Sequence, residues 1–378
     1  MKIVHVHHHY WPVVGGLENV VRALAEGMAK LGHEVHVVTS TYGAEGRPRE
    51  EVVNEVHVHR VKSLRFSYPD LTYPLDYPVD VLKNADIVHG HSQNSLFIVK
   101  IIEKAKSLGV KTVIHFMAVD TFDDHPNLLV RLFGSRYADL VLKKALNLAD
   151  IILVRSLRDK DILDRRYGIN ADYVPDGVPC WFVMHKYSGD MFRNNYGMND
   201  NYMLYMGRLH PLKGVDVLIR AMDYVRREID LDLVVIGPGD PRPYNKLAER
   251  IGIKDKVHFL GFVDDETKIG AIDGSLGIAI PSICNYVEVY PMVITEAWAR
   301  NKPVIATMVG GIPYRVRHMV NGLLVPPRDP KALANAILYL ASNKELGRKL
   351  GAEGRKNVLT WDEVITKLIE IYLIRGSS

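Results

Sequence analysis

The apolar positions of the chain follow two alternating periods. Short runs rich in β-branched residues predict strands, because such side chains fit a pleated and half-buried surface. In the first half these runs lie at 2–6, 34–39, 55–61, 86–90, 111–116, 150–154 and 171–175. Apolar residues also recur with helical spacing, as in 18–31, 96–107 and 128–148. Strands joined by crossover helices indicate a parallel, doubly wound α/β sheet.

The second half of the chain repeats this alternation. Strands are predicted at 201–207, 231–237, 256–261, 276–282, 302–307 and 321–326. Helices are predicted at 214–228, 243–251, 264–272, 291–300, 330–341, 343–357 and 361–375. Residues 177–200 are turn-rich and show no sustained period, which is typical of a linker. We therefore expect Rossmann-like domains at 1–190 and 191–357, followed by a C-terminal helix within 358–378.

Composition limits the classes of function. With 378 residues and 47% hydrophobic content, the chain is long enough for two separate cores. A net charge of +4 is too small for a general nucleic-acid surface, so no nucleic acid is expected as a partner. No apolar run reaches the length of a membrane span, and the chain starts directly with a strand. We expect a cytoplasmic protein, at most peripheral to a membrane.

Two Gly-Gly pairs stand between a predicted strand and a predicted helix. They are Gly15-Gly16 and Gly310-Gly311. Ligands of open α/β sheets bind beyond the carboxyl ends of the strands, and glycines let the backbone approach them. Helix N-termini also favour anions. The first pair is equally readable as a tight turn.

Charged residues follow several strands of the second half. Arg208 and Lys213 come directly after the first strand, where two cations are costly unless they meet an anion. Glu288 and Glu296 lie around the start of the helix at 291–300, where they could hold sugar hydroxyls or act in acid–base chemistry. The competing interpretations are solvated surface charges and partners of the helix dipole.

Histidines cluster near two strands of the first half. His115 closes the strand at 111–116, and we expect it to point into a cleft, with a satisfied core histidine as the alternative. His5 and His7 share one face of the first strand, because successive strand residues alternate between faces. A packing role is favoured for them over a metal site, so no metal is expected.

The order of these motifs resembles the family 4 retaining glycosyltransferases of the GT-B fold. The resemblance covers nearly the whole length and rests on segments such as GGLENVVRALAEGMAKLGHEVHVVT, YMGRLHPLKGVDVLIRAM, VHFLGFV and KPVIATMVGGIP. It implies two Rossmann-like domains facing across a cleft, with the last helix returning to the first domain. HYWPVVGGLE and HGHSQNS also resemble phosphatidylinositol N-acetylglucosaminyltransferase-like members.

The resemblance assigns roles to individual residues. Gly16, beside Gly15, matches the glycine that approaches the donor diphosphate, and the pair Arg208 and Lys213 would neutralise that diphosphate. The other matches are the donor-sugar and ribose carboxylates, the loop that reads the base, the second Gly-Gly turn and the histidine at the reaction centre: Glu288, Glu296, Gly261, Phe262, Val263, Gly310, Gly311 and His115. Pro291 departs from the pattern, since proline removes one amide donor near the sugar.

The implied reaction moves a hexose or N-acetylhexosamine from a nucleotide diphosphate sugar to a glycan, lipid-linked or small-molecule acceptor. No metal or other cofactor is implied, and a UDP-sugar is favoured over a GDP-sugar. Apolar and basic residues within 128–148 suggest peripheral membrane contact, although one apolar face in the core is the alternative. Two other functions remain open: a nucleotide-sugar 2-epimerase, and a non-catalytic nucleotide-sugar-binding subunit.

Overall fold

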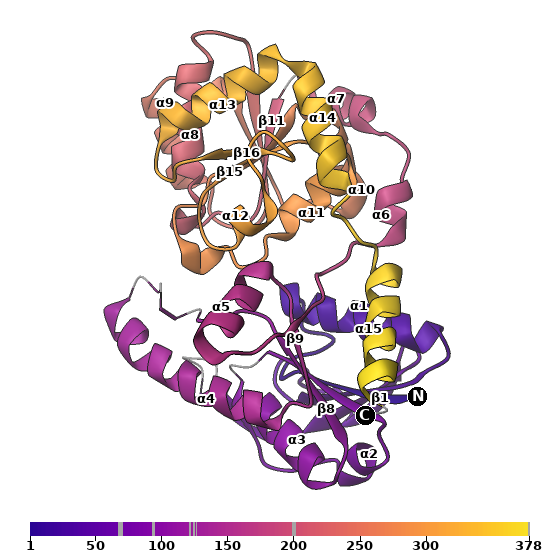
Figure 1. Ribbon diagram of the computed structural model, residues 1–378. Helices are drawn as coiled ribbons and strands as arrows, with labels where there is room; N and C mark the ends of the chain where they lie inside the picture. The colour runs from indigo at the N-terminus through magenta and orange to yellow at the C-terminus, as the bar shows by residue number, and fades with distance from the viewer. Residues whose placement is uncertain are drawn as a thin grey trace. The chain divides into compact units, whose positions relative to one another are not determined.

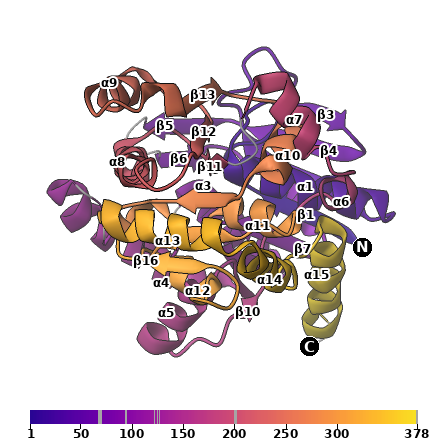
Figure 2. The ribbon, with the colours of Figure 1, turned by 90° about the horizontal axis from the view of Figure 1, so that it is seen from above.

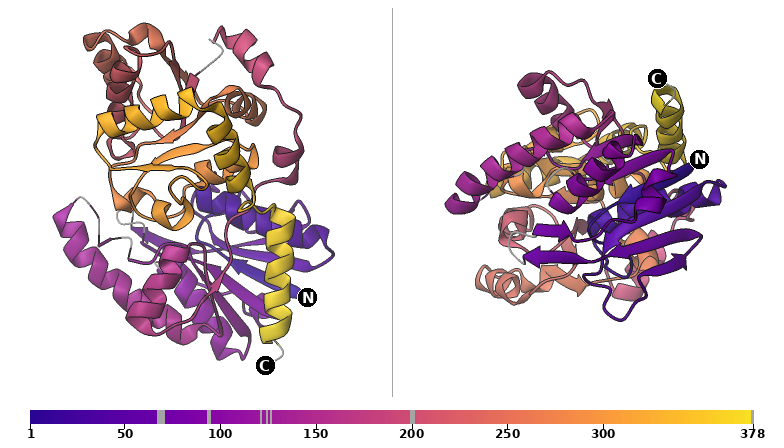
Figure 3. Two further views of the ribbon diagram at one scale, coloured as in Figure 1. Left: turned by 45° about the horizontal axis from the view of Figure 1, so that its top comes forward. Right: turned by 90° about the horizontal axis from the view of Figure 1, so that it is seen from below.

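The chain folds into two compact α/β units. The computed structural model describes residues 1–66, 71–92, 95–120, 122–123, 125, 127–198 and 202–376 (Figure 1). Unit 1 comprises Met1–Asp176 together with Trp361–Ser378, and unit 2 comprises Gly177–Thr360. Unit 2 is thus inserted into unit 1, and both ends of the chain belong to unit 1 (Figure 3).

The sheet of unit 1 has eight strands in the order β10-β9-β8-β7-β1-β2-β4-β3. Its members are β1 (Lys2–Val6), β2 (Glu34–Ser40), β3 (Glu50–Val53), β4 (Val56–Val61), β7 (Ile87–His91), β8 (Lys111–Phe116), β9 (Ile151–Val154) and β10 (Asp172–Tyr173). Only the edge strand β3 runs antiparallel to its neighbour. A separate antiparallel pair is formed by β5 (Ser63–Phe66) and β6 (Leu71–Pro74).

Helices connect the parallel strands of unit 1. They are α1 (Gly16–Lys30), α2 (Val79–Lys83), α3 (Leu96–Ser107), α4 (Ser135–Leu148) and α5 (Leu157–Tyr167), with a π-helical turn at Val130–Gly134 before α4. The C-terminal helix α15 (Trp361–Gly376) packs against α1. It buries Val364, Ile365, Leu368 and Tyr372. The prediction that this helix returns to the first domain is therefore confirmed.

Unit 2 contains a six-stranded parallel sheet in the order β13-β12-β11-β14-β15-β16. The strands are β11 (Tyr202–Met206), β12 (Asp232–Ile236), β13 (Val257–Gly261), β14 (Gly277–Ile280), β15 (Val304–Thr307) and β16 (Leu323–Val325). The helices are α6 (Cys180–Met184), α7 (Gly189–Tyr196), α8 (Val215–Val225), α9 (Arg242–Arg250), α10 (Asp265–Gly274), α11 (Met292–Ala299), α12 (Ile312–Arg315), α13 (Pro330–Ser342) and α14 (Lys344–Arg355).

Two apolar cores cover the two faces of the unit 2 sheet. Alternate residues of a strand point to opposite faces, so Met203 and Tyr205 face the core with α8, α9 and α13, whereas Tyr202 and Leu204 face the core with α10 and α11. Figure 2 shows α8 and α13 on one side of the strands and α10 on the other. The doubly wound architecture predicted for this half is therefore confirmed.

The division between the units differs from the expected domain limits at 190 and 357. Residues 177–190 lie in unit 2 because they pack there: Phe182 is buried in the core with α10 and α11. The Arg300 guanidinium donates to the carbonyls of Phe182 and Val183, at 3.0 and 3.1 Å. The expected linker at 177–200 thus contains α6 and α7. Val178 pairs with Thr360, which keeps residues 358–360 in unit 2 as well.

Candidate functional site

An ion pair with a buried carboxylate joins two loops at the carboxyl edge of the unit 2 sheet. Lys213 ends a 3-10 turn after β11, and Glu288 follows a 3-10 turn after β14. The Lys213 ammonium lies 2.7 Å from Glu288 Oε1 and 3.3 Å from the carbonyl oxygen of Val287. The Glu288 side chain is only 2% exposed. The sequence predicted an anion for Lys213, and the structure supplies Glu288 as that anion.

Hydroxyl groups at the strand ends hold Glu288 in place. Ser282 donates a short hydrogen bond from Oγ to Glu288 Oε1. Thr307, at the end of β15, in turn donates from Oγ1 to the carbonyl of Ser282, at 2.5 Å. Both hydroxyl side chains are 1% exposed. This chain of bonds fixes the carboxylate beside Lys213.

The Gly310-Gly311 turn packs against the loop that carries Glu288. Gly310 has a φ of +55°, and a Cβ atom there would clash with the Glu288 carbonyl. A Cβ on Gly311 would clash with the Val289 carbonyl. The Gly310 amide donates to Asn285 Oδ1 at 2.8 Å, and the Gly311 amide donates to the Glu288 carbonyl at 2.7 Å. Both amides are therefore engaged within unit 2.

Arg208 stands apart from these contacts. Its side chain is exposed, and among the described residues it forms no ion pair. Its carbonyl accepts a 2.9 Å hydrogen bond from the Tyr205 hydroxyl, which anchors the backbone of the loop. Burial raises the pKa of Tyr205, and the nearby Glu288 charge raises it further, so the hydroxyl remains a donor. Arg208 is thus a solvent-facing cation at the edge where Lys213 is only partly exposed.

Glu296 lies on α11 and forms an ion pair with Lys268 of α10. The Lys268 ammonium lies 3.0 Å from Glu296 Oε1 and 2.9 Å from Asp265 Oδ1. The Glu296 side chain keeps 20% of its surface exposed. It therefore retains access to solvent, and a hydroxyl ligand would share this carboxylate with Lys268.

The loop after β13 presents an exposed aromatic side chain. Gly261 has a φ of +71°, and its carbonyl accepts a 2.8 Å hydrogen bond from the Gly237 amide. Phe262 is 84% exposed, whereas Val263 packs partly against the core. The aromatic ring of Phe262 is not part of the core, so it is free to contact a ligand.

Gly15 and Gly16 form the N-terminal end of α1 in unit 1. A Cβ at Gly15 would meet the Glu18 carboxylate, a flexible group, and a Cβ at Gly16 would meet no described heavy atom within 4 Å. The φ of Gly15 is −160°, an extended value that any residue adopts. Packing within unit 1 therefore does not require a glycine at position 16. The feature is consistent with a ligand that approaches the backbone.

His115 is buried within a cluster of histidines in unit 1. Its side chain is 2% exposed, and its ring stacks on His89 with 5.7 Å between centroids. His5 Nδ1 lies 2.9 Å from His91 Nε2, and His89 Nδ1 lies 2.6 Å from the Tyr372 hydroxyl. The expectation that His115 points into a cleft is thus corrected: its neighbours are core histidines, because His5, His89, His91 and His115 share one face of adjacent strands.

Burial keeps these histidines neutral. Desolvation lowers the pKa of His115 to about 3, and the Arg155 charge acts in the same direction. Burial likewise lowers the pKa of His5 to about 3 and those of His89 and His91 well below the usual value. Nitrogen atoms of His5, His89 and His91 lie within 4.8 Å of one another.

Sequence reasoning missed the groups that support Glu288. Ser282, Asn285 and Thr307 were not singled out, although Ser282 and Thr307 are polar residues directly at the ends of apolar strands. A polar residue at the end of an apolar strand was the feature of the sequence that could have identified Ser282 and Thr307. The ring Nδ1 of His210 accepts a hydrogen bond from the Leu212 amide at 3.2 Å and so caps the turn that carries Lys213. The residue spacing in the sequence did not reveal this cap.

Comparisons with known proteins agree with this arrangement. Residues 14–181 match the model described as Glycosyltransferase Family 4, and residues 189–357 match Glycosyl transferases group 1. Together the two matches span most of the chain. The chain belongs to the family 4 glycosyltransferases. Their GT-B fold accounts for the two Rossmann-like units, as the sequence indicated.

Several relatives and several solved structures of other proteins align with nearly the whole of this glycosyltransferase. An uncharacterized glycosyltransferase of Methanocaldococcus jannaschii is 27% identical over 99% of this chain and 98% of the relative. The N-acetyl-alpha-D-glucosaminyl L-malate synthase of Bacillus anthracis is 25% identical, over 92% and 90% of the two chains. The crystal structure of Anabaena HepE in complex with UDP aligns with a TM-score of 0.77 at 18% identity, covering 99% of this chain and 100% of the other.

Proposed function

We propose that this glycosyltransferase moves a hexose or N-acetylhexosamine from a UDP-sugar to an acceptor hydroxyl, with retention and without a metal ion. The observation that carries the proposal is the ion pair between Lys213 and the buried Glu288 at the carboxyl edge of the unit 2 sheet. A donor diphosphate near Lys213 would draw the ammonium toward its own charge. Glu288 would then be left to accept hydrogen bonds from sugar hydroxyls.

Charge stabilisation is the central step of the proposed mechanism. Negative charge grows on the diphosphate as the sugar departs, and fixed cations stabilise it where it develops. Lys213 is held in position, while the exposed Arg208 is free to reach a ligand. These two cations would supply the positive charge that a divalent metal ion supplies in a metal-dependent enzyme. The departing phosphate would accept the proton of the acceptor hydroxyl, so no separate general base is invoked.

Nucleotide recognition is assigned to three features of the chain. We assign the ribose hydroxyls to Glu296, the base to the loop of Gly261, Phe262 and Val263, and the diphosphate approach to Gly16. The exposure of Phe262 and the absence of a packing reason for Gly16 support these roles. Structures of Anabaena HepE in complex with UDP and with UDP-glucose are the reason for favouring uridine.

A lipid-linked acceptor is the second part of the proposal. Leu128, Leu129, Leu132 and Phe133 are 55, 65, 53 and 66% exposed, which counts against the alternative of a buried apolar face. Arg131 and Arg136 are exposed on the same segment. Apolar and cationic side chains together suit the surface of an anionic membrane. The likeness of HYWPVVGGLE to enzymes that modify inositol phospholipid supports the same class of acceptor. No described helix is long and apolar enough to cross a membrane.

A donor panel tests the proposal directly. Thermal unfolding would be followed with UDP-glucose, UDP-N-acetylglucosamine, UDP-galactose and GDP-mannose, each with and without EDTA. A donor at 100 times its dissociation constant stabilises the fold by about 2.7 kcal/mol. We expect one UDP-sugar to stabilise the protein and to lose its sugar slowly, both insensitive to EDTA.

Other outcomes of the panel would replace the proposal. Binding without turnover, even with lipid acceptors present, would indicate a non-catalytic nucleotide-sugar-binding subunit. Conversion of the donor alone to its C2 epimer, seen by nuclear magnetic resonance, would indicate a 2-epimerase. Loss of activity in EDTA that Mg²⁺ restores would contradict the metal-free mechanism.

A further inference from the structure

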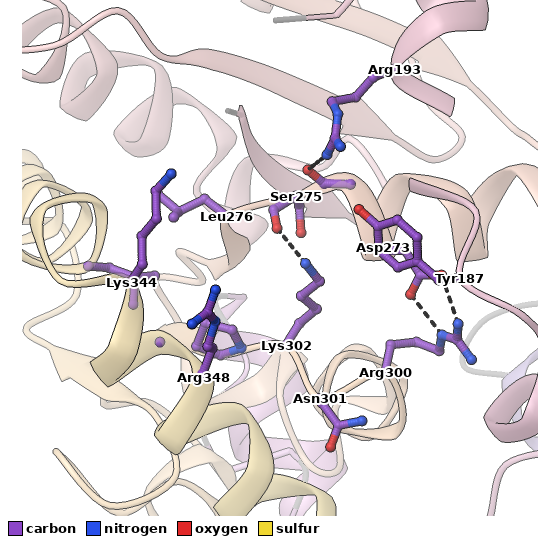
Figure 4. Close-up of a pocket in the computed structure, with 14 residues that line it drawn as sticks. Tyr187, Arg193, Asp273, Ser275, Leu276, Arg300, Asn301, Lys302, Lys344 and Arg348 are labelled. Atoms are coloured by element: carbon purple, nitrogen blue, oxygen red, sulfur yellow. Dashed lines mark hydrogen bonds and ion pairs between the residues drawn. The ribbon is translucent and has the colours of Figure 1, made fainter. Parts of the chain in front are cut away.

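A basic pocket opens at the amino-terminal edge of the unit 2 sheet. The hollow has a volume of about 580 Å³ and lies between the segments that precede β14 and β15 and the start of α14 (Figure 4). Five cationic side chains line it: Arg193, Arg300, Lys302, Lys344 and Arg348. The single carboxylate in its lining is Asp273. We refer to this hollow as the basic pocket.

The lining carboxylate is already committed to one of these cations. Asp273 forms a two-pronged ion pair with Arg300, at 2.8 Å from Oδ1 to Nε and 2.7 Å from Oδ2 to Nη2. Asp273 Oδ2 also accepts from the Ser188 amide at 3.2 Å. Arg193 forms its own ion pair with Asp190. The positive charge of Lys302 and Lys344 is therefore not balanced by a carboxylate in the lining, and Arg348 lies 3.7 Å from the carboxylate of Glu345, which does not line the pocket.

Lys302 is the most constrained of the cations. Its ammonium donates to the Ser275 carbonyl at 2.8 Å, and no carboxylate of the described residues lies within ion-pair distance. Burial lowers the pKa of Lys302 to about 8, and the charges of Arg193 and Arg300 oppose protonation although Asp273 favours it. A buried amine among cations is costly unless an anion completes the site.

The position of the basic pocket separates it from the site that holds Glu288. Lys302 comes just before β15, and Ser275 comes just before β14, whereas Ser282 and Thr307 stand at the opposite ends of these strands. A strand advances about 3.3 Å per residue, so the four residues of β14 place the two edges about 13 Å apart. A nucleotide bound beside Lys213 does not account for the basic pocket.

We propose that the basic pocket binds a phosphorylated small molecule, distinct from the donor nucleotide, with Lys302, Lys344 and Arg348 holding its phosphate group. Arginine offers a planar fork that fits phosphate oxygens, and each lysine adds a mobile positive charge. The hollow also has room for an organic group beyond the phosphate, since ligand pockets commonly begin at about 300 Å³.

Pyridoxal 5′-phosphate is a suitable probe, because its aldehyde reacts with neutral amines and its phosphate reports on the pocket. At pH 7.5 about a quarter of amines with a pKa near 8 are neutral, against about one in a thousand at a pKa near 10.4. After borohydride reduction, mass spectrometry would rank the labelled lysines of the intact chain. We expect Lys302 to be labelled first, and millimolar inorganic phosphate to suppress that labelling.

Two variants separate phosphate binding from simple reactivity. In Lys344→Ala/Arg348→Ala, we expect labelling of Lys302 by pyridoxal 5′-phosphate to fall about tenfold, since two cations contribute about 1.4 kcal/mol. Trace labelling by acetic anhydride, a neutral reagent, should change less than twofold. Lys349→Ala is the matched control, because Lys349 is exposed on the same helix and does not line the pocket.

Three labelling results would contradict the proposed phosphate site. Labelling of Lys302 that ignores inorganic phosphate, or that is equal in the double variant and in Lys349→Ala, would show that no phosphate site exists there. Protection by UDP but not by phosphate would assign the labelled site to the nucleotide instead. None of these readings depends on glycosyl transfer, so the proposed function and this inference can fail separately.

Discussion

At the scale of single residues, the Lys213–Glu288 pair carries the chemistry that we propose. Lys213→Ala should lower turnover by at least about a hundredfold, because a preorganised cation at the developing charge is lost. The measurement is kcat with the donor that the panel identifies, with circular dichroism to show that the fold persists.

A second variant separates chemistry from stability in this pair. Lys213→Ala leaves the buried Glu288 carboxylate without its cation, which by itself destabilises unit 2. Lys213→Ala/Glu288→Gln should regain thermal stability but not turnover. Near-normal turnover in Lys213→Ala would contradict the assignment of this lysine.

The Gly-Gly pairs give opposite predictions although they look alike in sequence. Gly16→Ala should leave the free energy of unfolding within about 0.5 kcal/mol, because a Cβ there has open space. Gly311→Ala should destabilise by about 1–3 kcal/mol, because its Cβ would clash with the Val289 carbonyl. Urea unfolding checks both values.

Binding of UDP completes the comparison of the two glycines. We expect Gly16→Ala to weaken UDP binding in calorimetry, since the added methyl group would stand where the diphosphate approaches. Unchanged binding would mean that the nucleotide does not approach α1, whatever the stability data show.

The location of a candidate site residue was predictable where that residue directly follows a predicted strand. The residues Arg208, Lys213, Glu288 and Gly310 all lie on loops at the carboxyl edge of the unit 2 sheet, where sequence reasoning placed them. What those residues touch was not predictable. The engagement of the Gly310 and Gly311 amides depends on the path of residues 285–289, and no local pattern encodes that path.

At the scale of elements, strands β1, β7 and β8 carry an acid-sensitive layer. His5, His89, His91 and His115 have lowered pKa values in the folded state, whereas the unfolded chain takes up protons near pH 6.5. The unfolded state therefore binds more protons below that pH. The stability is fully present above about pH 6.5 and is lost as pH falls, by up to about 1.4 kcal/mol per pH unit for each histidine.

Urea unfolding between pH 7.5 and 5 measures this dependence. His91→Gln should reduce the slope by about one proton equivalent, because one buried titrating group is removed. The groups around this layer include Tyr372 of α15 and Arg155 beyond β9, neither of which titrates in that range, and His7, whose charge acts on His91. His185→Gln, at a partly exposed position outside this layer, is the control. Equal slopes for the two variants would contradict the prediction.

The segment before α4 carries the prediction for membranes. Leu132→Ser/Phe133→Ser should lose co-sedimentation with anionic liposomes at low salt, because both side chains are more than half exposed. Thermal stability should not change. Val52→Ser, at a 61% exposed position of β3, is the matched control. Failure of the unaltered protein to co-sediment would remove the membrane proposal.

Element limits followed from the hydrophobic pattern wherever the pattern was strong. The strands at 2–6 and 111–116 and the helix at 96–107 have the predicted limits. Helix α5 was missed because its sequence, LRDKDILDRRY, is mostly charged and buries few apolar residues. The hairpin of β5 and β6 was also missed, since two short strands outside the main sheet give little alternation.

At the scale of the whole molecule, α15 ties the end of the chain to unit 1. Removing residues 361–378 exposes Val364, Ile365, Leu368 and Tyr372, each of which contributes about 1.5–3 kcal/mol when buried. We expect calorimetry to show a lower transition temperature for unit 1 and an unchanged one for unit 2. A shift of both transitions, or of neither, would contradict this division.

The two-domain architecture was predictable because the βα alternation restarts along the chain. The domain boundaries were harder to predict, because residues 177–190 have the sequence pattern of a linker. Only the contacts of Phe182 with the unit 2 core and with Arg300 place this segment in unit 2. Those contacts join positions more than a hundred residues apart, which a single sequence does not reveal.

The insertion of unit 2 within unit 1 also sets an order for biosynthesis. A ribosome delivers the chain from its N-terminal side, so unit 1 begins before unit 2, but helix α15 of unit 1 emerges only after Thr360. Unit 2 is therefore available in full before unit 1 is. During synthesis, the surface of α1 and the histidine layer beside Tyr372 stay uncovered until α15 has left the exit tunnel. The half that is started first is completed last, and its nascent form is the one that chaperones would meet.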